Sequence, residues 1–129
     1  MNDRFVSIIV AAYNAKGTIK KCLDSLLELA YPHYEIIIVD DGSTDETRAI
    51  LSLYKERIVI IKNQHAGPSK CRNVAAQRAQ GEFLAFTDAD CLVDRNWLKE
   101  LLQGFDDDQV AAVGGSQSSP DDETAFGKK

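Results

Sequence analysis

Five short apolar runs, separated by segments long enough to hold a helix, constrain this chain more than any other feature of its sequence. The runs are VSIIVAA from Val6, IIIV from Ile36, IVII from Ile58, FLAF from Phe83 and VAAV from Val110. They are continuous rather than alternating, which is typical of strands whose two faces are both covered in a parallel sheet. Their starts lie 30, 22, 25 and 27 residues apart, which leaves room for a crossover helix between successive strands.

The segments between the runs have the periodicity of amphipathic helices. One apolar stripe consists of Ile19, Cys22, Leu23, Leu26, Leu27 and Ala30. A second stripe, within residues 71–79, is followed by Gly81, which is placed to end a helix. Ser43 and Glu46 have the spacing of a capping box, and Asp94 can cap a fourth helix. The alternation predicts an α/β fold, a three-layer α/β/α sandwich with a mainly parallel sheet.

Length and composition fit one domain. A chain of 129 residues with 44% hydrophobic residues can bury a core of its own. We expect this domain to occupy residues 1–115, because residues 116–129 are polar and lack periodicity. The tail is predicted to be a polar loop or a truncated linker.

Charge and cysteine content exclude several functions. Fifteen basic and 20 acidic residues give a net charge of −5, the wrong sign for a protein that must neutralise nucleic acid phosphates. The three cysteines form no Cys-x-x-Cys pair, so neither a disulfide framework nor a zinc site is predicted, and a reduced, cytoplasmic setting fits best. No apolar run approaches the length of a membrane span.

Three polar clusters directly follow predicted strands. They are AAYN at residues 11–14, DDGSTD at residues 40–45 and TDAD at residues 87–90. Ligands of open parallel α/β sheets bind at the carboxyl ends of the strands, so we expect these clusters to meet there. A second Asp-x-Asp triplet, Asp106 and Asp108, precedes the fifth run and is interpreted as a solvated loop at the opposite edge.

The pair Asp88 and Asp90 suggests a cation, because two carboxylates this close repel each other unless something positive joins them. No G-x-G-x-x-G follows the first strand and no G-x-x-x-x-G-K-[ST] occurs, so neither a dinucleotide fold nor a P-loop is predicted. If a phosphate binds here, we expect Mg²⁺ or Mn²⁺ to hold it, since both prefer oxygen ligands. The alternative is that the two aspartates only cap the next helix, but Asp94 is better placed for that.

Four segments stand in a characteristic order: VSIIVAAYNAKGTIKKCLDSLL, YEIIIVDDGSTDET, CRNVAAQRAQGEFLAFTDADC and NWL. Together they resemble the donor-binding half of a family 2 glycosyltransferase. The match runs from about Phe5 to Gly115. The resemblance implies the GT-A fold, a Rossmann-like nucleotide-diphospho-sugar transferase fold, here apparently truncated.

The resemblance also implies a pocket for the nucleotide base. By motif position, Asp41 would accept a hydrogen bond from the base, and Ala11 and Tyr13 would line the same pocket. An ionised aspartate only accepts, which suits the ring N–H of uracil or guanine. Members of the family most often use uridine, so the expected donor is a UDP-sugar.

The rest of the implied site binds the ribose, the diphosphate and a metal. The first aspartate of the Asp-x-Asp motif, Asp88, would lie against the ribose, and Asp90 would coordinate Mg²⁺ or Mn²⁺, with Asp88 as a second candidate ligand. Arg72 and Asn73 match the Arg-Asn pair of the family at the start of the third helix. We therefore include Arg72 among the nucleotide-sugar-binding residues.

The implied function is inverting transfer of a sugar to a saccharide or lipid-linked acceptor in polysaccharide or cell envelope biosynthesis. Such an enzyme would work in the cytoplasm or at the inner face of a membrane, with peripheral association through regions absent from this sequence. The acceptor hydroxyl needs a general base, which the resemblance places beyond residue 129. His33 and His65 are interpreted as surface loop histidines, although His65 could face the ligand edge.

Two other functions remain open at this point. One is a phosphoacceptor receiver domain, also α/β, which uses clustered acids with Mg²⁺. In a receiver the acidic pair should follow the first strand, whereas here Asp40 and Asp41 follow the second. The other is a nucleotide-sugar binding module without turnover of its own.

Overall fold

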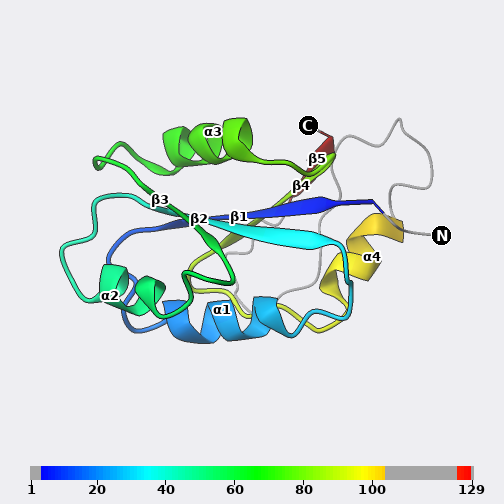
Figure 1. Ribbon diagram of the computed structural model, residues 1–129, viewed down its shortest axis with the longest axis horizontal. Helices are drawn as coiled ribbons and strands as arrows, with labels where there is room; N and C mark the ends of the chain where they lie inside the picture. The colour runs from blue at the N-terminus through cyan, green and yellow to red at the C-terminus, as the bar shows by residue number, and fades with distance from the viewer. Residues whose placement is uncertain (1–3, 104–124, 129) are drawn as a thin grey trace.

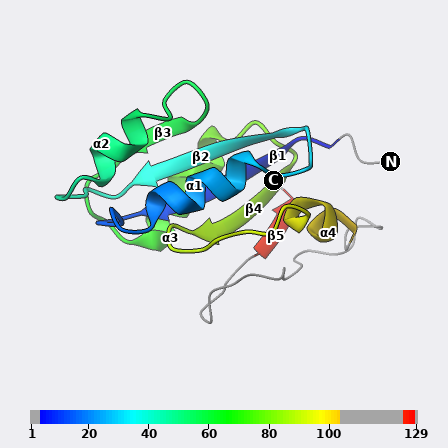
Figure 2. The same ribbon diagram turned by 90° about the horizontal axis from the view of Figure 1, so that it is seen from below.

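The computed structural model describes residues 4–103 and 125–128, and it arranges them as alternating strands and helices (Figure 1). Along the chain these are β1 (Val6–Ala12), α1 (Ile19–Leu27), β2 (Tyr34–Asp40), α2 (Thr47–Ser52), β3 (Val59–Lys62), α3 (Pro68–Arg78), β4 (Phe83–Asp88), α4 (Trp97–Gln103) and β5 (Ala125–Lys128). The helix α3 covers one face of the sheet, and α1, α2 and α4 lie on the other face (Figures 1 and 2). The predicted α/β/α layering is confirmed.

The strands lie in the order β3-β2-β1-β4-β5. The first four are parallel, and β5 runs antiparallel to β4. From β1 the chain builds outward to β2 and β3, then crosses back to place β4 on the other side of β1. The strand order reverses at β1, and ligands of open α/β sheets bind outside the carboxyl ends of the strands at such a point.

Both faces of the sheet are buried, which explains why the strands read as continuous apolar runs. Neighbouring residues of β1 point to opposite faces: Ile8 belongs to the core under α1 and α4, and Ile9 to the core under α3. The larger core contains the fully buried Trp97 of α4. On the other face α3 contributes only small side chains, Cys71 and Ala75 among them, so this helix packs close to the sheet.

The end of the sheet differs from the prediction. The run VAAV from Val110 and the boundary at residue 115 lie outside the described residues. The strand β5 instead falls in the segment expected to be a polar loop, so that expectation is wrong for residues 125–128. Its four residues pair with β4 through backbone hydrogen bonds. Such bonds do not require apolar side chains, so an edge strand of this kind need not contain an apolar run that the sequence would reveal.

The start of α2 also differs from the prediction. This helix begins at Thr47, and its amide donates to the Asp45 carboxylate at 2.8 Å. Ser43 does not cap it, because the Ser43 hydroxyl accepts the amide of Asn14 at 2.9 Å. The expected cap before α4 is present, since Asp94 accepts the amide of Asn96 at 2.9 Å.

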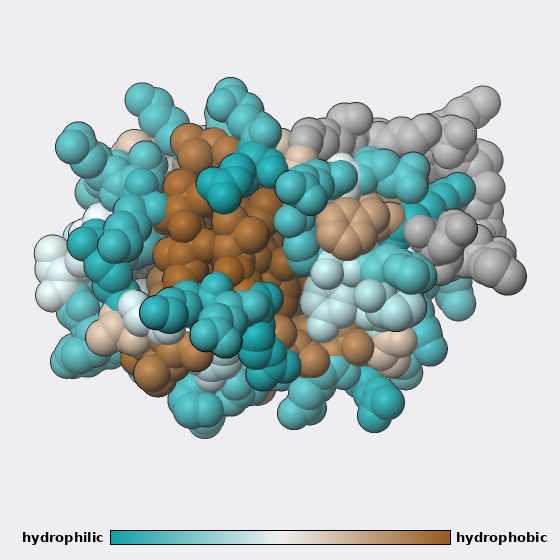
Figure 3. All heavy atoms as spheres, in the orientation of Figure 1, coloured by the Kyte–Doolittle hydropathy of each residue, from teal (hydrophilic) through white to brown (hydrophobic). Residues whose placement is uncertain are grey.

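The strand β3 forms the other edge of the described sheet. Its residues Val59, Ile60 and Ile61 are only half-buried. In the orientation of Figure 1, apolar atoms form a band across the surface between hydrophilic margins (Figure 3). We attribute the band in part to β3, because an edge strand has a neighbouring strand on one side only and its apolar side chains stay partly exposed on the other.

Gly81 does not end α3, which stops at Arg78, and its φ is not among the positive glycine values. Glycine is needed here for space: a Cβ at this position would lie 2.6 Å from the backbone nitrogen of Ser7 and 2.8 Å from the carbonyl oxygen of Phe5. We expect Gly81→Ala to lower the free energy of unfolding by about 1–3 kcal/mol, as forced overpacking does. Urea unfolding measures this change.

Gly17→Ala is the matched control. A Cβ at Gly17 would meet nothing within 4 Å, and its φ is not positive. That substitution should leave stability unchanged or raise it slightly by restricting the unfolded chain. Equal stability of the two variants would contradict the close approach of Gly81 to β1.

Candidate functional site

The carboxyl ends of β1, β2 and β4 lie together at one edge of the sheet. In the parallel register Ala12 pairs with Asp40, and Ala11 pairs with Asp88. The loops that follow these strands therefore begin at the same level. The predicted meeting of the three polar clusters is confirmed.

Two pockets open at this edge. The first, here called the Asp41 pocket, has a volume of about 90 Å³ and is lined by Ala11, Ala12, Tyr13, Asp41 and Pro68. The second, the Asp90 pocket, has a volume of about 280 Å³ and is lined by Ala11, Tyr13, Asn14, Ala15, Thr18, Ala89 and Asp90. Because the two share Ala11 and Tyr13, they adjoin each other as compartments of one site.

Asp41 is held by the loop between β3 and α3. The residue is 3% exposed, and its carboxylate accepts the amide of Ala66 at 2.9 Å and that of Gly67 at 3.0 Å. Burial raises the pKa of Asp41, but these two hydrogen bonds, the Cys71 thiol and the charge of His65 outweigh it and hold the pKa below its usual value. At neutral pH this carboxylate is therefore ionised and can only accept hydrogen bonds.

Gly67 supplies one of the two amides that hold the Asp41 carboxylate. Its φ of 99° lies in a region that favours glycine, and it precedes Pro68, the first residue of α3. The Gly67 amide, directly before α3, donates to the Asp41 carboxylate at 3.0 Å. The side chain of Cys71, one turn into α3, also faces Asp41, and burial raises the pKa of this thiol to about 11.

Tyr13 and His65 form an aromatic pair across the mouth of the site. Their ring centroids are 4.2 Å apart with an interplanar angle of 33°. The His65 Nδ1 lies 3.2 Å from the backbone oxygen of Asp41 and 3.3 Å from its carboxylate. His65 is thus a residue of the site and not only a surface histidine; its position just after β3 is the signal in the sequence. His33, in contrast, is exposed as expected.

The loops after β1 and β2 are tied together by Asn14. This residue has a positive φ of 47°, and its side-chain oxygen accepts the amides of Thr44 at 2.7 Å and Asp45 at 3.3 Å. Its own amide donates to Ser43. These bonds fix the position of the neighbouring Tyr13 relative to the loop that carries Asp41.

Asp40, the first aspartate of the DDGSTD segment, has a structural role. Asp40 is fully buried, and its carboxylate accepts Nε of Arg48 at 2.7 Å and the amide of Ser43 at 3.1 Å. It lines neither pocket. Adjacent aspartates therefore have separate duties, since Asp40 holds the loop and Asp41 faces the pocket.

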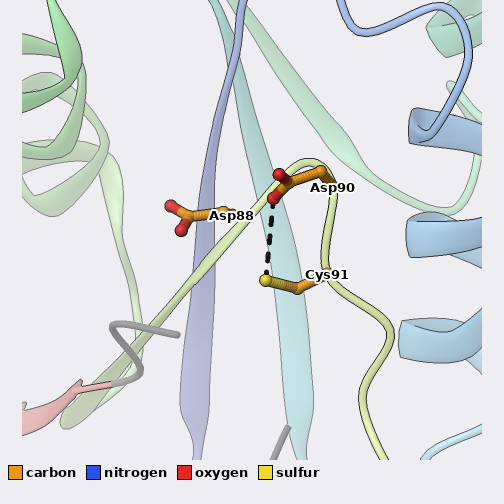
Figure 4. Close-up of side chains that lie close together, drawn as sticks. All are labelled: Asp88, Asp90 and Cys91. Atoms are coloured by element: carbon orange, nitrogen blue, oxygen red, sulfur yellow. Dashed lines mark hydrogen bonds between the residues drawn. The ribbon is translucent and has the colours of Figure 1, made fainter. Parts of the chain in front are cut away.

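Asp88, Asp90 and Cys91 come together where β4 ends (Figure 4). Their potential ligand atoms all lie within 4.8 Å of one another; Asp88 is half-buried, Asp90 exposed and Cys91 buried. The thiol of Cys91 lies 3.7 Å from the Asp90 carboxylate and donates to it. Of the two carboxylates, that of Asp90 lines the Asp90 pocket, whereas Asp88 lies close to it but lines neither pocket.

The donors at this position fit a hard divalent cation. Mg²⁺ and Mn²⁺ are typically bound by one or two carboxylates, with substrate phosphates and water at the other positions. Asp88 and Asp90 supply such oxygens, and the exposure of Asp90 leaves room for further ligands. The softer Cys91 sulfur is buried beneath them and is engaged with Asp90.

The start of α3 brings a cation to the same place. The guanidinium of Arg72 lies 3.8 Å from the Asp88 carboxylate, and both side chains are about one third exposed, at 36% and 39%. Asn73 is exposed on α3 and lines neither pocket. The structure therefore groups Ala11, Tyr13 and Asp41, and places Arg72 with Asp88 and Asp90.

Some predicted positions lie outside the described residues, among them the second triplet, Asp106 and Asp108. Within residues 4–103 and 125–128, no helix is both long and apolar enough to cross a membrane.

Comparison with known proteins identifies relatives of this arrangement. The model of the family Glycosyl transferase family 2 matches residues 7–129. A relative from Escherichia coli, the UDP-Glc:alpha-D-GlcNAc-diphosphoundecaprenol beta-1,3-glucosyltransferase WfaP, is 47% identical over 87 residues, which are 66% of this chain and 35% of WfaP.

Two solved structures have the same fold. The mannosyltransferase PcManGT from Pyrobaculum calidifontis, in complex with GDP-Man and Mn²⁺, superposes with a TM-score of 0.90 at 26% identity over 99% of this chain and 45% of its own. S. aureus TarS in complex with UDP-GlcNAc has a TM-score of 0.67 at 35% identity over 74% of this chain and 29% of its own. The chain thus spans less than half the length of these proteins.

Proposed function

Because this chain belongs to glycosyl transferase family 2, we propose that it binds a nucleoside-diphosphate sugar, with a divalent metal, for transfer of the sugar to an acceptor. The observation that carries the proposal is the pair of adjoining pockets. A buried, ionised acceptor, Asp41, lines one pocket, and Asp90, whose carboxylate lies within 4.8 Å of that of Asp88, lines the other. A ligand with a base at one end and a diphosphate at the other matches that division.

In the proposed complex the base enters the Asp41 pocket. Ala11 and Tyr13 line the pocket, and Asp41 accepts the ring N–H of the base through a charge-assisted hydrogen bond. The relatives include one protein solved with UDP-GlcNAc and one solved with GDP-Man, so the fold accepts either base. We propose a UDP-sugar, because WfaP is named for UDP-Glc and TarS was solved with UDP-GlcNAc.

The diphosphate occupies the Asp90 pocket in this proposal. The chain has a net charge of −5, so a polyanion must be met by local positive charge. Arg72 supplies one cation beside Asp88, and Asp88 and Asp90 would hold Mg²⁺ or Mn²⁺. When bound, the metal would act as a Lewis acid that neutralises charge on the leaving diphosphate. The presence of Mn²⁺ in the PcManGT structure supports this assignment.

The acceptor side of the reaction also belongs to the proposal. We infer a saccharide or lipid-linked acceptor, reached from the cytoplasm or from the inner face of a membrane. A general base must take the proton of the acceptor hydroxyl. We propose that it comes from outside these 129 residues, since the relatives are more than twice the matched length.

The receiver-domain alternative is not supported. It needs a free acidic pair with Mg²⁺, but Asp40 is fully buried and paired with Arg48. A binding module without turnover remains compatible with the same pockets, and it differs from the proposed enzyme in the acceptor side alone.

Calorimetric titration of UDP into this chain, with Mn²⁺ and with a chelator, tests the proposal. We expect binding that depends on the metal, because the diphosphate reaches the Asp88 and Asp90 carboxylates only through a shared cation. Binding of equal strength in the chelator would contradict the metal assignment. Failure to bind in either condition would contradict the donor site as a whole.

A further inference from the structure

His65 contacts both residues on which the proposed base recognition depends. Its ring lies 4.2 Å from that of Tyr13, and its Nδ1 lies 3.3 Å from the Asp41 carboxylate. The side chain is 61% exposed, so it contributes little to the hydrophobic core. The His65 ring can therefore influence how Tyr13 and Asp41, two residues that line the Asp41 pocket, are oriented.

The contacts of His65 fix which ring nitrogen carries its proton. Nδ1 faces the backbone oxygen and the carboxylate of Asp41, at 3.2 and 3.3 Å. Both oxygens can only accept, so Nδ1 must donate. This N–H donates to the backbone oxygen of Asp41 and lies beside the carboxylate, whose two oxygens accept the amides of Ala66 and Gly67, so His65 adds a further contact that holds Asp41 in place.

The neighbouring loop leaves room for this arrangement. Gly42 has a positive φ of 81°, and a Cβ there would lie 3.0 Å from the backbone nitrogen of His65 and 3.4 Å from its Cβ. Any other residue at this position would be strained and would also push the His65 backbone away from Asp41. The backbone around Asp41 is therefore shaped to let His65 approach.

We propose that His65 is a positioning residue that determines base specificity: it aims the Asp41 carboxylate at a ring N–H and braces the Tyr13 ring beside the base. This inference rests on the proposed function. It predicts that the Nδ1 proton and the aromatic ring contribute separately, the first to discrimination between bases and the second to affinity for any base.

Two substitutions separate these contributions. His65→Phe keeps a ring but removes the N–H, and His65→Asn keeps a short N–H donor but removes the ring. The probes are UDP and UDP methylated at N3 of uracil, which lacks the N–H that Asp41 accepts. Affinities are measured by calorimetry with Mn²⁺, and thermal unfolding checks that each variant is folded.

We expect the unmodified chain to prefer UDP strongly over the methylated probe. His65→Phe should weaken UDP binding about tenfold, the worth of one hydrogen bond that holds Asp41 in place, and should lose most of that preference. His65→Asn should weaken both probes to a similar extent and keep the preference. His33→Phe is the matched control, because His33 is exposed and has its own aromatic neighbour, Tyr31, at 5.9 Å.

Each result is informative. If the unmodified chain binds both probes equally, base reading by Asp41 is wrong, and this inference is overturned with it. If the unmodified chain prefers UDP and His65→Phe keeps the same preference, the inference is overturned while the proposed function stands. The same holds if His65→Phe weakens both probes equally, since that is the effect of a purely structural residue.

Discussion

Asp41→Asn is expected to weaken UDP binding by about a hundredfold or more. The carboxylate is the acceptor for two backbone amides, and in the proposed complex it also accepts the ring N–H of uracil. The side chain of asparagine has a single acceptor oxygen, and its NH₂ group would face one of these N–H donors, so that one donor would lose its acceptor. Loss of hydrogen bonds to a charged group, each worth about 1.5–3 kcal/mol, accounts for an effect of this size.

The same substitution should lower stability in a pH-dependent way. Because the folded protein holds the pKa of Asp41 below 3.8, ionised Asp41 contributes stability above that pH. The contribution is lost as the pH falls through 3.8 toward the folded pKa. Urea unfolding at neutral pH should therefore show a deficit in Asp41→Asn that shrinks in acid.

Asp40→Asn separates recognition from folding. Asp40 is also buried and hydrogen-bonded, but it pairs with Arg48 and lines neither pocket. This variant should lose stability as well, because Arg48 keeps its charge without a partner, yet the folded protein should bind UDP with nearly unchanged affinity. UDP affinities of Asp41→Asn and Asp40→Asn within a few-fold of each other would rule out base reading by Asp41.

The layers of the fold were predictable because burial leaves a mark in the sequence. A strand covered on both faces, such as β1, is apolar at nearly every position, the exception here being Ser7, which donates to Glu35. This pattern can be recognised without knowledge of the partner strands. The strand β5 carries no such pattern, since it joins β4 through backbone hydrogen bonds that any residue except proline can make. Its pairing is a tertiary property that the segment does not encode alone.

The site was predictable where it depends on the ends of strands. Asp41 directly follows β2, Asp88 is the last residue of β4 and Asp90 lies two residues further on, so the sheet topology brings all three to one edge. The contacts between loops could not be read in the same way. His65 meets Tyr13 where the β3–α3 loop passes Asp41, and the course of a loop depends on backbone angles and distant contacts that the local sequence does not specify.

The predicted capping box at Ser43 also failed because of a contact with another loop. The spacing of Ser43 is correct for a cap, but a serine has one side-chain oxygen, and Asn14 of another loop uses it. Local patterns compete with partners distant in the sequence, and at this site the distant partner is preferred because it joins two loops that must be held together.

Asp90→Asn is expected to remove the metal dependence of UDP binding. With Mn²⁺ present, its affinity should fall to that of the unmodified chain in chelator, a loss of about tenfold to a hundredfold for a lost charged ligand. A neutral amide binds a hard cation more weakly than a carboxylate, and Asp88 alone leaves too few charged oxygens to retain it. Titrations of UDP into the variant and into the unmodified chain, each with Mn²⁺ and with chelator, give the affinities to be compared.

Asp94→Asn is the control for this change, because it removes an equal charge from the same loop. Asp94 accepts the amide of Asn96 at the start of α4, and asparagine caps helices as well as aspartate does. The metal-dependent gain in affinity should survive there and vanish in Asp90→Asn. If both variants keep the gain, Asp90 is not a ligand, and the cation must sit on donors other than the Asp-x-Asp pair. If both lose it, the metal acts through the overall charge of the β4–α4 loop, because only a specific ligand distinguishes two aspartates four residues apart.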